Sequence, residues 1–171
     1  MILGIIDTIR GLVNRINPDI LFECDAPEMM NIKADTISRD IPAGFVYVEE
    51  PTSGYYEIPY RGYQKQRVSL RVYFCDFEPM ANDAYKGDSN FSWNSRTEAR
   101  LSIRERIEET MVRPFLYLLK NSDTGMRYPG ILSSVRVTYP VPQFDANEVS
   151  VCLELTFEDS WCLDNYKPIQ R

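Results

Sequence analysis

The sequence of 171 residues contains no histidine. Histidine is the most common general base, a member of Ser-His-Asp and Cys-His arrangements, and a frequent zinc ligand. The usual phosphate-binding patterns, GxGxxG and GxxxxGK followed by Ser or Thr, are also missing. These absences remove the common hydrolytic triads and phosphate cradles, and they lower the expectation of an enzyme without excluding one.

Cysteine is sparse, and the cysteines are far apart. The four cysteines are Cys24, Cys75, Cys152 and Cys162, and no CxxC pair occurs. Zinc ribbons and thioredoxin-type redox motifs need such pairs, and small secreted scaffolds place their cysteines much closer together. We therefore expect reduced, buried or half-buried thiols in a reducing compartment.

Long apolar runs are absent as well. No stretch approaches the roughly 20 apolar residues that a membrane-spanning helix requires. The apolar N-terminus lacks the basic start of a secretion signal, and Asp7 and Arg10 soon interrupt it. We expect no membrane association and a protein kept in the cytoplasm or built there into something larger.

Positive charge is also scarce, with 25 acidic and 19 basic residues giving a net charge of −6. A non-specific DNA binder needs a clustered positive surface, and no basic run exists. Arg61, Lys65 and Arg67 form a local cluster that is either a partner contact or an ordinary solvated strand edge. The acidic balance is compatible with a channel through which DNA slides without sticking.

The length and the remaining features of the composition are typical of one globular domain. The chain length fits a single domain spanning residues 1–171, and the apolar and charged fractions, 44% and 26%, are ordinary. The aromatic residues include 11 tyrosines. Tyrosine suits half-buried sheets and subunit interfaces alike, because it joins an apolar ring to a hydroxyl group.

Two helices are predicted from apolar spacing. Isoleucine and valine recur at helical spacing over residues 2–16, and the helix should end at the Asn-Pro pair that follows. A second helix should begin at Ser95 or Thr97 and run towards Lys120. Pro114 lies inside it and should kink or split it.

Alternating apolar residues predict the strands. Phe45–Val48 and Tyr55–Tyr60 should form an antiparallel hairpin, and residues 68–75 alternate clearly. Residues 135–141 and 149–157 should form a closing hairpin. The expected fold is α+β, a mainly antiparallel four- to five-stranded sheet with two helices packed on one face.

Two segments outside these elements contain candidate contacts. A long loop spans residues 78–95, and connections of such length are usually functional or mobile. A tail at 159–171 should dock on a neighbour or on its own domain. Aromatic side chains in these segments either pack back on the domain or anchor a partner. The residues concerned are Tyr85, Phe91, Trp93 and Trp161.

The strongest catalytic candidate is an acidic group at the end of the central strand. Asp76 and Glu78 could hold Mg²⁺ for phosphodiester hydrolysis, with further carboxylates downstream at Asp83, Asp88 and Glu98. A restriction-nuclease site would also need a Glu-x-Lys pattern on a following strand, and the final hairpin lacks that lysine. An acidic loop is the simpler interpretation, and no metal or cofactor is expected.

The order of these elements resembles the tail-terminator and neck proteins of long-tailed bacteriophages. The features that support the resemblance are the apolar first helix, the strand Phe45–Val48 running into Glu49-Glu50-Pro51, the strand Gln66–Phe77, the helix Thr97–Lys120, the hairpin Ser134–Glu158, and Phe144-Asp145-Ala146-Asn147 leading into residues 149–157. The resemblance covers most of the chain as an architecture, without a diagnostic motif.

The resemblance implies a homo-oligomer. Members of this family form six-fold rings that cap the tail tube and meet the head connector, with DNA passing through. The loop 78–94 and the hairpin tip around Asp145 would be ring and partner contacts. The protein would be made in the host cytoplasm and end in the virion. Because of the long loop 78–95 and the tail 159–171, the sequence leaves open whether the protein is a terminator, a connector or an adaptor.

Three hypotheses follow from the sequence. The first is a non-catalytic ring subunit of the tail-terminator or neck type. The second is a small Mg²⁺-dependent phosphodiesterase that uses Asp76 and Glu78. The third is a monomeric adaptor domain with an exposed patch around Trp93.

Overall fold

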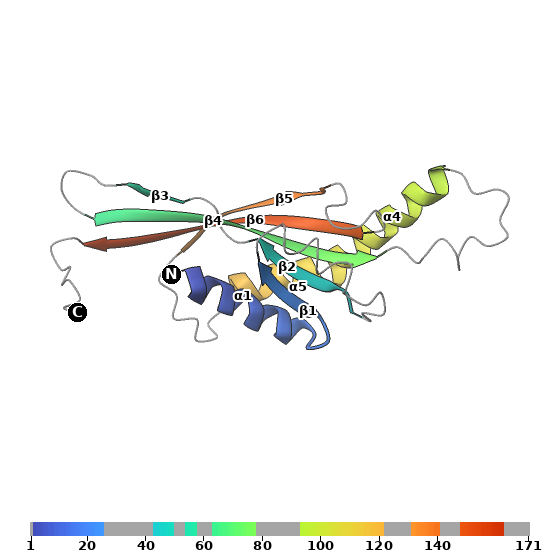
Figure 1. Ribbon diagram of the computed structural model, residues 1–171, viewed down its shortest axis with the longest axis horizontal. Helices are drawn as coiled ribbons and strands as arrows, with labels where there is room; N and C mark the ends of the chain where they lie inside the picture. Colours follow the sequence, from blue (N-terminus) through green and yellow to red (C-terminus); the bar gives the residue numbers. More distant parts are fainter. Residues whose placement is uncertain are drawn as a thin grey trace.

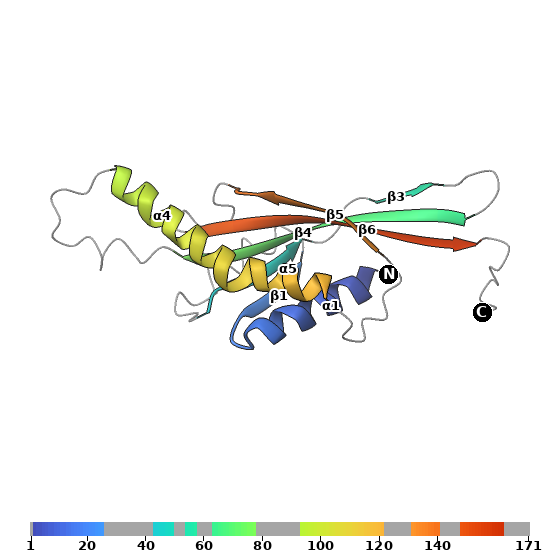
Figure 2. The same ribbon diagram turned by 180° about the vertical axis from the view of Figure 1, so that it is seen from behind.

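The computed structural model describes residues 2–25, 43–49, 54–57, 63–77, 93–121, 131–140 and 148–162. In chain order the elements are α1 (Ile2–Ile16), β1 (Leu21–Asp25), β2 (Phe45–Glu49), β3 (Gly54–Glu57), β4 (Tyr63–Phe77), a long helix made of α4 (Trp93–Ile107), the π-helical segment η1 (Glu108–Val112) and α5 (Arg113–Lys120), then β5 (Ile131–Thr138) and β6 (Glu148–Cys162). One sheet forms a layer, and α1 and α5 lie against one of its faces (Figures 1 and 2). The expected α+β class is confirmed.

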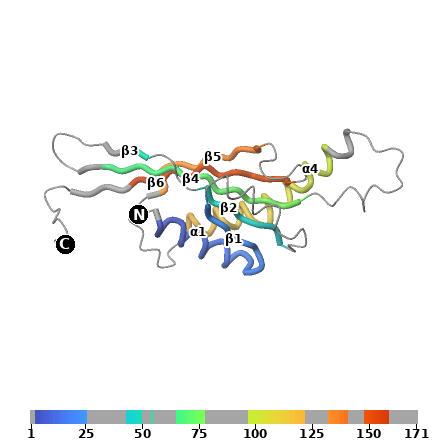
Figure 3. Tube along the Cα trace, viewed as in Figure 1, coloured from blue at the N-terminus to red at the C-terminus, as the bar shows by residue number. Residues whose placement is uncertain are grey.

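The sheet has the order β1-β2-β4-β6-β5, and β3 pairs with β4 outside this path. β1 and β2 run parallel, and the other pairs are antiparallel. β6, the last strand in sequence, lies between β4 and β5. The long β4 and β6 run side by side along the molecule (Figure 3). Among the described strands, β1 is therefore the outermost on one side and β5 the outermost on the other.

α1 forms where the apolar spacing predicted a helix. Ile5, Ile9 and Val13 are fully buried, and Leu3 on another side of the helix is exposed. The helix ends at Ile16, as expected, because proline follows at the second position beyond it. The chain then turns into β1, and the Ile20 N–H donates to the Asn17 carbonyl at 3.2 Å in this turn.

The second helix begins at Trp93, slightly earlier than expected, and it ends at Lys120 as predicted. Pro114 lies in the first turn of α5, directly after the wider π-helical segment. In that segment the Arg113 N–H donates to the Glu108 carbonyl, five residues back. The helix thus changes its hydrogen-bond register next to the proline, which has no N–H to donate and would crowd a regular turn.

The predicted hairpin between Phe45–Val48 and Tyr55–Tyr60 is wrong. β2 pairs with the second half of β4, where Phe45 lies opposite Cys75. β3 pairs with the first half of β4, where Gly54 lies opposite Val68. β6 occupies the other side of β4 along its whole length, so β2 and β3 follow one another along the same side. A strand of 15 residues is long enough to pair with both.

The predicted boundaries of the long loop and the tail also need correction. Residues 93–95 belong to α4, and residues 159–162 belong to β6, where they pair with residues 63–66 of β4. This pairing, together with β3, extends the sheet beyond α1 and α5 (Figure 1). The remainder of both segments lies outside the described residues, as does the expected turn at 142–147.

The core lies between the sheet and the helices. Val68, Leu70, Val72 and Phe74 of β4 are buried there, which confirms the face predicted from their alternation. The ring of Phe74 meets that of Phe115 of α5 edge to face, with centroids 5.2 Å apart. Alternate apolar residues of β2 and β6 complete this layer, so the packing of apolar side chains positions the sheet against the helices.

Gly44 sets the start of β2 against β4. Its φ angle is +79°, a conformation that side chains with a Cβ rarely adopt. A Cβ there would lie 2.7 Å from the Cys75 carbonyl oxygen and 3.2 Å from Cε of Met111. Only glycine fits this close approach of the chain to β4.

Candidate functional site

The face of the sheet opposite α1 and α5, here called the outer face, is where the polar side chains gather. The register of the strands places alternate residues on it. The side chains concerned are Phe45, Tyr47 and Glu49 of β2, Lys65, Arg67, Ser69, Arg71, Tyr73 and Cys75 of β4, and Glu148, Ser150, Cys152, Glu154, Thr156 and Glu158 of β6. One end of this face is charged, and the other is aromatic.

Lys65 and Arg67, two of the predicted contact residues, meet at the charged end. Lys65 Nζ lies 3.1 Å from Oε1 of Glu158, and Arg67 Nε donates to Oε2 at 2.7 Å. The hydrogen bond from Arg67, followed by that from Lys65, lowers the pKa of Glu158 below its ordinary value. Both members of this basic pair therefore lie beside one carboxylate within the sheet, which offsets one of their two positive charges.

Further cations on this face also lie beside carboxylates. Arg71 Nε lies 3.2 Å from Glu154 Oε1, and its Nη1 lies 3.7 Å from Glu49 Oε2. Arg136 of β5 lies 3.7 Å from the other oxygen of Glu154. Because positive and negative groups alternate, the described part of this face carries no unbroken basic stripe of the kind that retains duplex DNA.

The other end of the outer face is a buried aromatic and thiol cluster made of Phe45, Tyr47, Tyr73, Cys75 and Cys152. The rings of Tyr47 and Tyr73 are stacked with centroids 5.8 Å apart. Tyr47 Oη donates to the Asp25 carbonyl at 2.8 Å. All five side chains of this cluster are buried within the chain.

Burial controls the ionisation of this cluster. It raises the pKa of Tyr47 and of Tyr73. Glu49 raises the pKa of Tyr47 further, and Cys152, followed by Glu49, raises that of Tyr73. Burial, followed by the neighbouring Glu148, also raises the pKa of the Cys75 thiol. The thiolate is the reactive form of cysteine, so Cys75 is held in an unreactive state at neutral pH.

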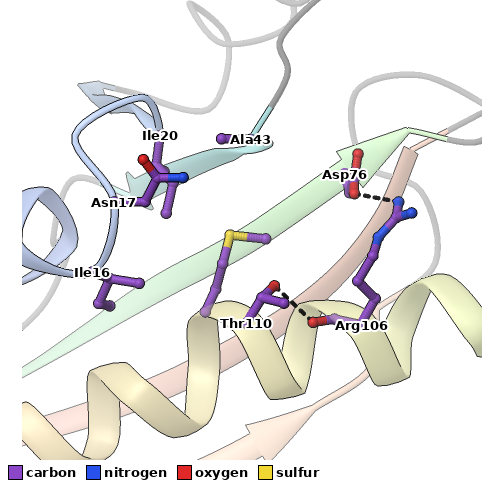
Figure 4. A pocket seen from close by; sticks show the side chains of 8 residues that line it. Ile16, Asn17, Ile20, Ala43, Asp76, Arg106 and Thr110 are labelled. Carbon is purple, nitrogen blue, oxygen red and sulfur yellow. Dashed lines mark hydrogen bonds and ion pairs between the residues drawn. The ribbon is translucent and has the colours of Figure 1, made fainter.

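A pocket of about 430 Å³ lies beside Asp76, the residue proposed for a metal site (Figure 4). Its lining comes from the end of α1, the start of β2, the end of β4 and the long helix, with Ile16, Asn17, Ile20, Ala43, Asp76, Arg106, Thr110 and Met111 around it. Asp76 Oδ2 accepts a hydrogen bond from Arg106 Nη2 at 2.5 Å. Its other oxygen accepts from the Phe77 N–H at 2.8 Å.

The surroundings of the Asp76 carboxylate bear on the hypothesis that this residue holds Mg²⁺. A cation at the Asp76 carboxylate would compete with the guanidinium of Arg106 for the same oxygen. Glu98 lies on α4, and the other acidic candidates, Glu78, Asp83 and Asp88, lie outside the described residues. Within the described part of the chain, no group of three or more histidine, cysteine or acidic side chains could hold a metal ion.

β5 presents an exposed apolar surface at the edge of the sheet. Val135, Val137 and Tyr139 are 39%, 42% and 54% exposed. The register sets Val135 opposite Leu155 and Val137 opposite Leu153, so these valines lie on the helix side of the sheet. The alternation over residues 135–141 predicted this strand but not the exposure of its valines, because exposure depends on the position of the strand in the sheet.

Tyr139 connects the end of this surface to the long helix. Its hydroxyl donates to Glu108 Oε1 at 2.6 Å, and the guanidinium of Arg104 lies 5.6 Å from the centre of its ring. Arg104 also donates to the Pro140 carbonyl at 3.2 Å. These contacts fix the residues that follow β5 against the helix, so the exposed strand is held in one position.

The predicted contact residues do not form one cluster. Trp93 begins α4 and Trp161 lies near the end of β6, and these two element ends lie at opposite ends of the molecule (Figure 1). Lys65 and Arg67 lie on β4 in the same sheet extension as Trp161. The other predicted contacts, Arg61, Tyr85, Phe91 and Asp145, lie outside the described residues.

Comparison with known proteins gives no family. No protein-family model matches the chain, and a search of the curated proteins finds no match. Among the described helices, none is long and apolar enough to cross a membrane.

Proposed function

We propose that this chain is a subunit of a homo-oligomeric ring in a phage or prophage virion, at the tail terminus or neck, and that it acts through assembly without covalent chemistry. The observation that most supports this proposal is the exposed edge strand β5 with Val135 and Val137 on its surface. Proteins usually protect strand edges, and large exposed apolar surfaces generally mark interaction sites. Pairing of identical subunits would cover both features in a closed assembly.

The outer face supports the same proposal. Its cations lie beside carboxylates, and the net charge of the chain is −6. Such a subunit would let DNA pass without retaining it, since tight binding requires uncompensated positive charge. The tail tube and the head connector are the partners proposed, with assembly in the host cytoplasm.

Light scattering over a wide range of protein concentrations, at low and moderate salt, tests the ring. We expect a hexamer-sized species or a mass that grows with concentration. A strict monomer at every concentration would contradict assembly of the free chain and favour the adaptor. Thermal unfolding with and without EDTA tests the enzyme alternative, and we expect no difference between the two curves.

A further inference from the structure

The pocket beside Asp76 lies where four parts of the fold meet (Figure 4). α1 ends there, β2 begins, β4 ends, and the long helix passes along one side. On that side Arg106 belongs to α4, whereas Thr110 and Met111 belong to the π-helical segment η1. Single π-helical turns inside helices are frequent at functional sites. The volume of about 430 Å³ lies within the roughly 300–1,000 Å³ of small-molecule sites.

The lining of this pocket has an apolar part and a charged part. The apolar part comes from Ile16, Ile20, Ala43 and Met111. Figure 4 shows Ile16 and Ile20 on one side of the pocket, with Asp76 and Arg106 on the other. A molecule in the pocket therefore meets apolar surface at one end and an ion pair at the other.

The charged part offers hydrogen-bond donors more than acceptors. Both oxygens of Asp76 already accept hydrogen bonds, one from Arg106 Nη2 at 2.5 Å and one from the Phe77 N–H at 2.8 Å. The guanidinium of Arg106 carries five N–H donors, and its contact with Asp76 engages a single nitrogen. The Arg106 side chain is 57% exposed, against 23% for Asp76. The charged part is therefore better suited to an anion than to a cation.

Two contacts hold Arg106 in place beside the pocket. The ion pair with Asp76 orients its guanidinium, and the Thr110 hydroxyl donates to its backbone carbonyl at 2.8 Å. A side chain that is already positioned loses less conformational entropy when a ligand binds. The planar guanidinium also matches the geometry of a carboxylate, which can accept two parallel hydrogen bonds from it.

From this arrangement we infer that the pocket binds a small molecule with an aliphatic chain and one carboxylate. The chain lies against Ile16, Ile20 and Met111, and the carboxylate binds the guanidinium of Arg106. Asp76 positions Arg106 and competes with the ligand for it. This inference goes beyond the proposed ring, because the site lies within a single chain.

Equilibrium dialysis with labelled octanoate at neutral pH tests the ligand class, and it works equally well on monomers and on assemblies. We expect one saturable site in each chain. Octanol has the same aliphatic chain without a charge, and octylamine has a positive charge. Displacing octanoate should need about tenfold more of either, because neither forms the charge-assisted hydrogen bonds. Equal displacement by octylamine would overturn the preference for an anion.

Substitution of Arg106 tests the position of the site. Arg106→Gln should weaken octanoate binding by about tenfold or more, since it removes the charged donor. Arg113→Gln is the matched control, because Arg113 is 68% exposed on the same long helix and lies outside the pocket lining. It should change the affinity by no more than about twofold. With both variants folded by circular dichroism, equal affinities would show that octanoate binds elsewhere.

Substitution of Asp76 tests its role as a competitor. Asp76→Asn keeps the shape of the side chain and removes the negative charge beside Arg106. The affinity for octanoate should therefore rise several-fold. Loss of octanoate binding in this variant, with the fold intact, would contradict the assigned roles of the two residues.

The ring and the pocket can fail separately. If light scattering shows rings but the chain retains no octanoate, the inferred site is wrong and the ring survives. If a strict monomer binds octanoate and Arg106→Gln weakens that binding, the site is supported and assembly of the free chain is contradicted.

Discussion

The two faces of the β4–β6 pair differ although their side chains alternate along the same strands. On the helix side, Val72 and Phe74 lie in an apolar layer beneath the helices. On the outer face, Arg71 and Tyr73 alternate with them, and each has a polar partner. The comparison shows that one strand serves two environments. The helix side is apolar and packed throughout, whereas the outer face combines paired polar groups with a buried aromatic cluster.

The energetic weight of the two faces should differ accordingly. A fully buried large side chain contributes about 1.5–3 kcal/mol through removal of apolar surface from water. An exposed ion pair contributes only about 0–1 kcal/mol. Substitutions on the helix side should therefore unfold the protein more readily than substitutions on the outer face.

The largest effect is expected for Phe74→Ala. Phe74 is fully buried and packs against Phe115, so its truncation should lower the free energy of unfolding by about 3–5 kcal/mol. Urea denaturation measures the change. Tyr117→Ala is the control, because Tyr117 is 68% exposed on the same long helix, and its loss should cost no more than about 0.5 kcal/mol. Equal effects of the two variants would refute the core assigned to the helix side.

A smaller effect is expected for Tyr73→Phe on the outer face. The substitution keeps the stacked ring and removes the hydroxyl that donates to Glu49 Oε2 at 3.2 Å. The free energy of unfolding should fall by about 0.5–1.5 kcal/mol, as for the loss of one hydrogen bond. The same denaturation experiment measures it. A loss as large as that of Phe74→Ala would mean that the hydrogen bond from Tyr73 stabilises the fold as much as packing in the core does.

The smallest effect should appear in the pH dependence of stability. Arg67 and Lys65 lower the pKa of Glu158 in the folded protein, so its ionised form is favoured there. The resulting stabilisation is fully present above the pKa that Glu158 has in the unfolded chain, about 4.3. It is lost as the pH falls through the lower pKa of Glu158 in the folded protein. The difference in unfolding free energy between the unsubstituted protein and Glu158→Gln should therefore shrink between about pH 6 and pH 3. A difference that stays constant would show that the ion pairs do not stabilise the fold.

Local patterns predicted the elements whose burial follows from their own periodicity. The spacing over residues 2–16 predicted α1, and the alternation at 68–75 predicted the buried face of β4, because both patterns repeat within one element. The partners of the strands could not be predicted in this way. The choice of β4 rather than Tyr55–Tyr60 as the partner of Phe45–Val48 depends on which strands the whole chain brings together.

The ion pairs of the candidate site could not be predicted from local sequence patterns either. Lys65 and Arg67 stand out in the sequence as a basic pair, but Glu158, the carboxylate that lies beside them, is about ninety residues further along the chain. No local pattern connects these positions, since register across strands is a property of the folded sheet. The thiol at Cys75 became unreactive for the same reason, through burial next to Glu148.

The sequence by itself determined the α+β class, the helices over residues 2–16 and 97–120, the alternating faces of the long strands and the absence of histidine side chains. The tertiary structure alone decided that β6 lies between β4 and β5, and thereby that β5 is the outermost described strand on that side. The physical reason is that periodicity records which face of an element is apolar, whereas exposure depends on what lies beside that element. Val135 and Leu155 share one pattern and one register, yet of the two only Leu155 has described strands on both sides.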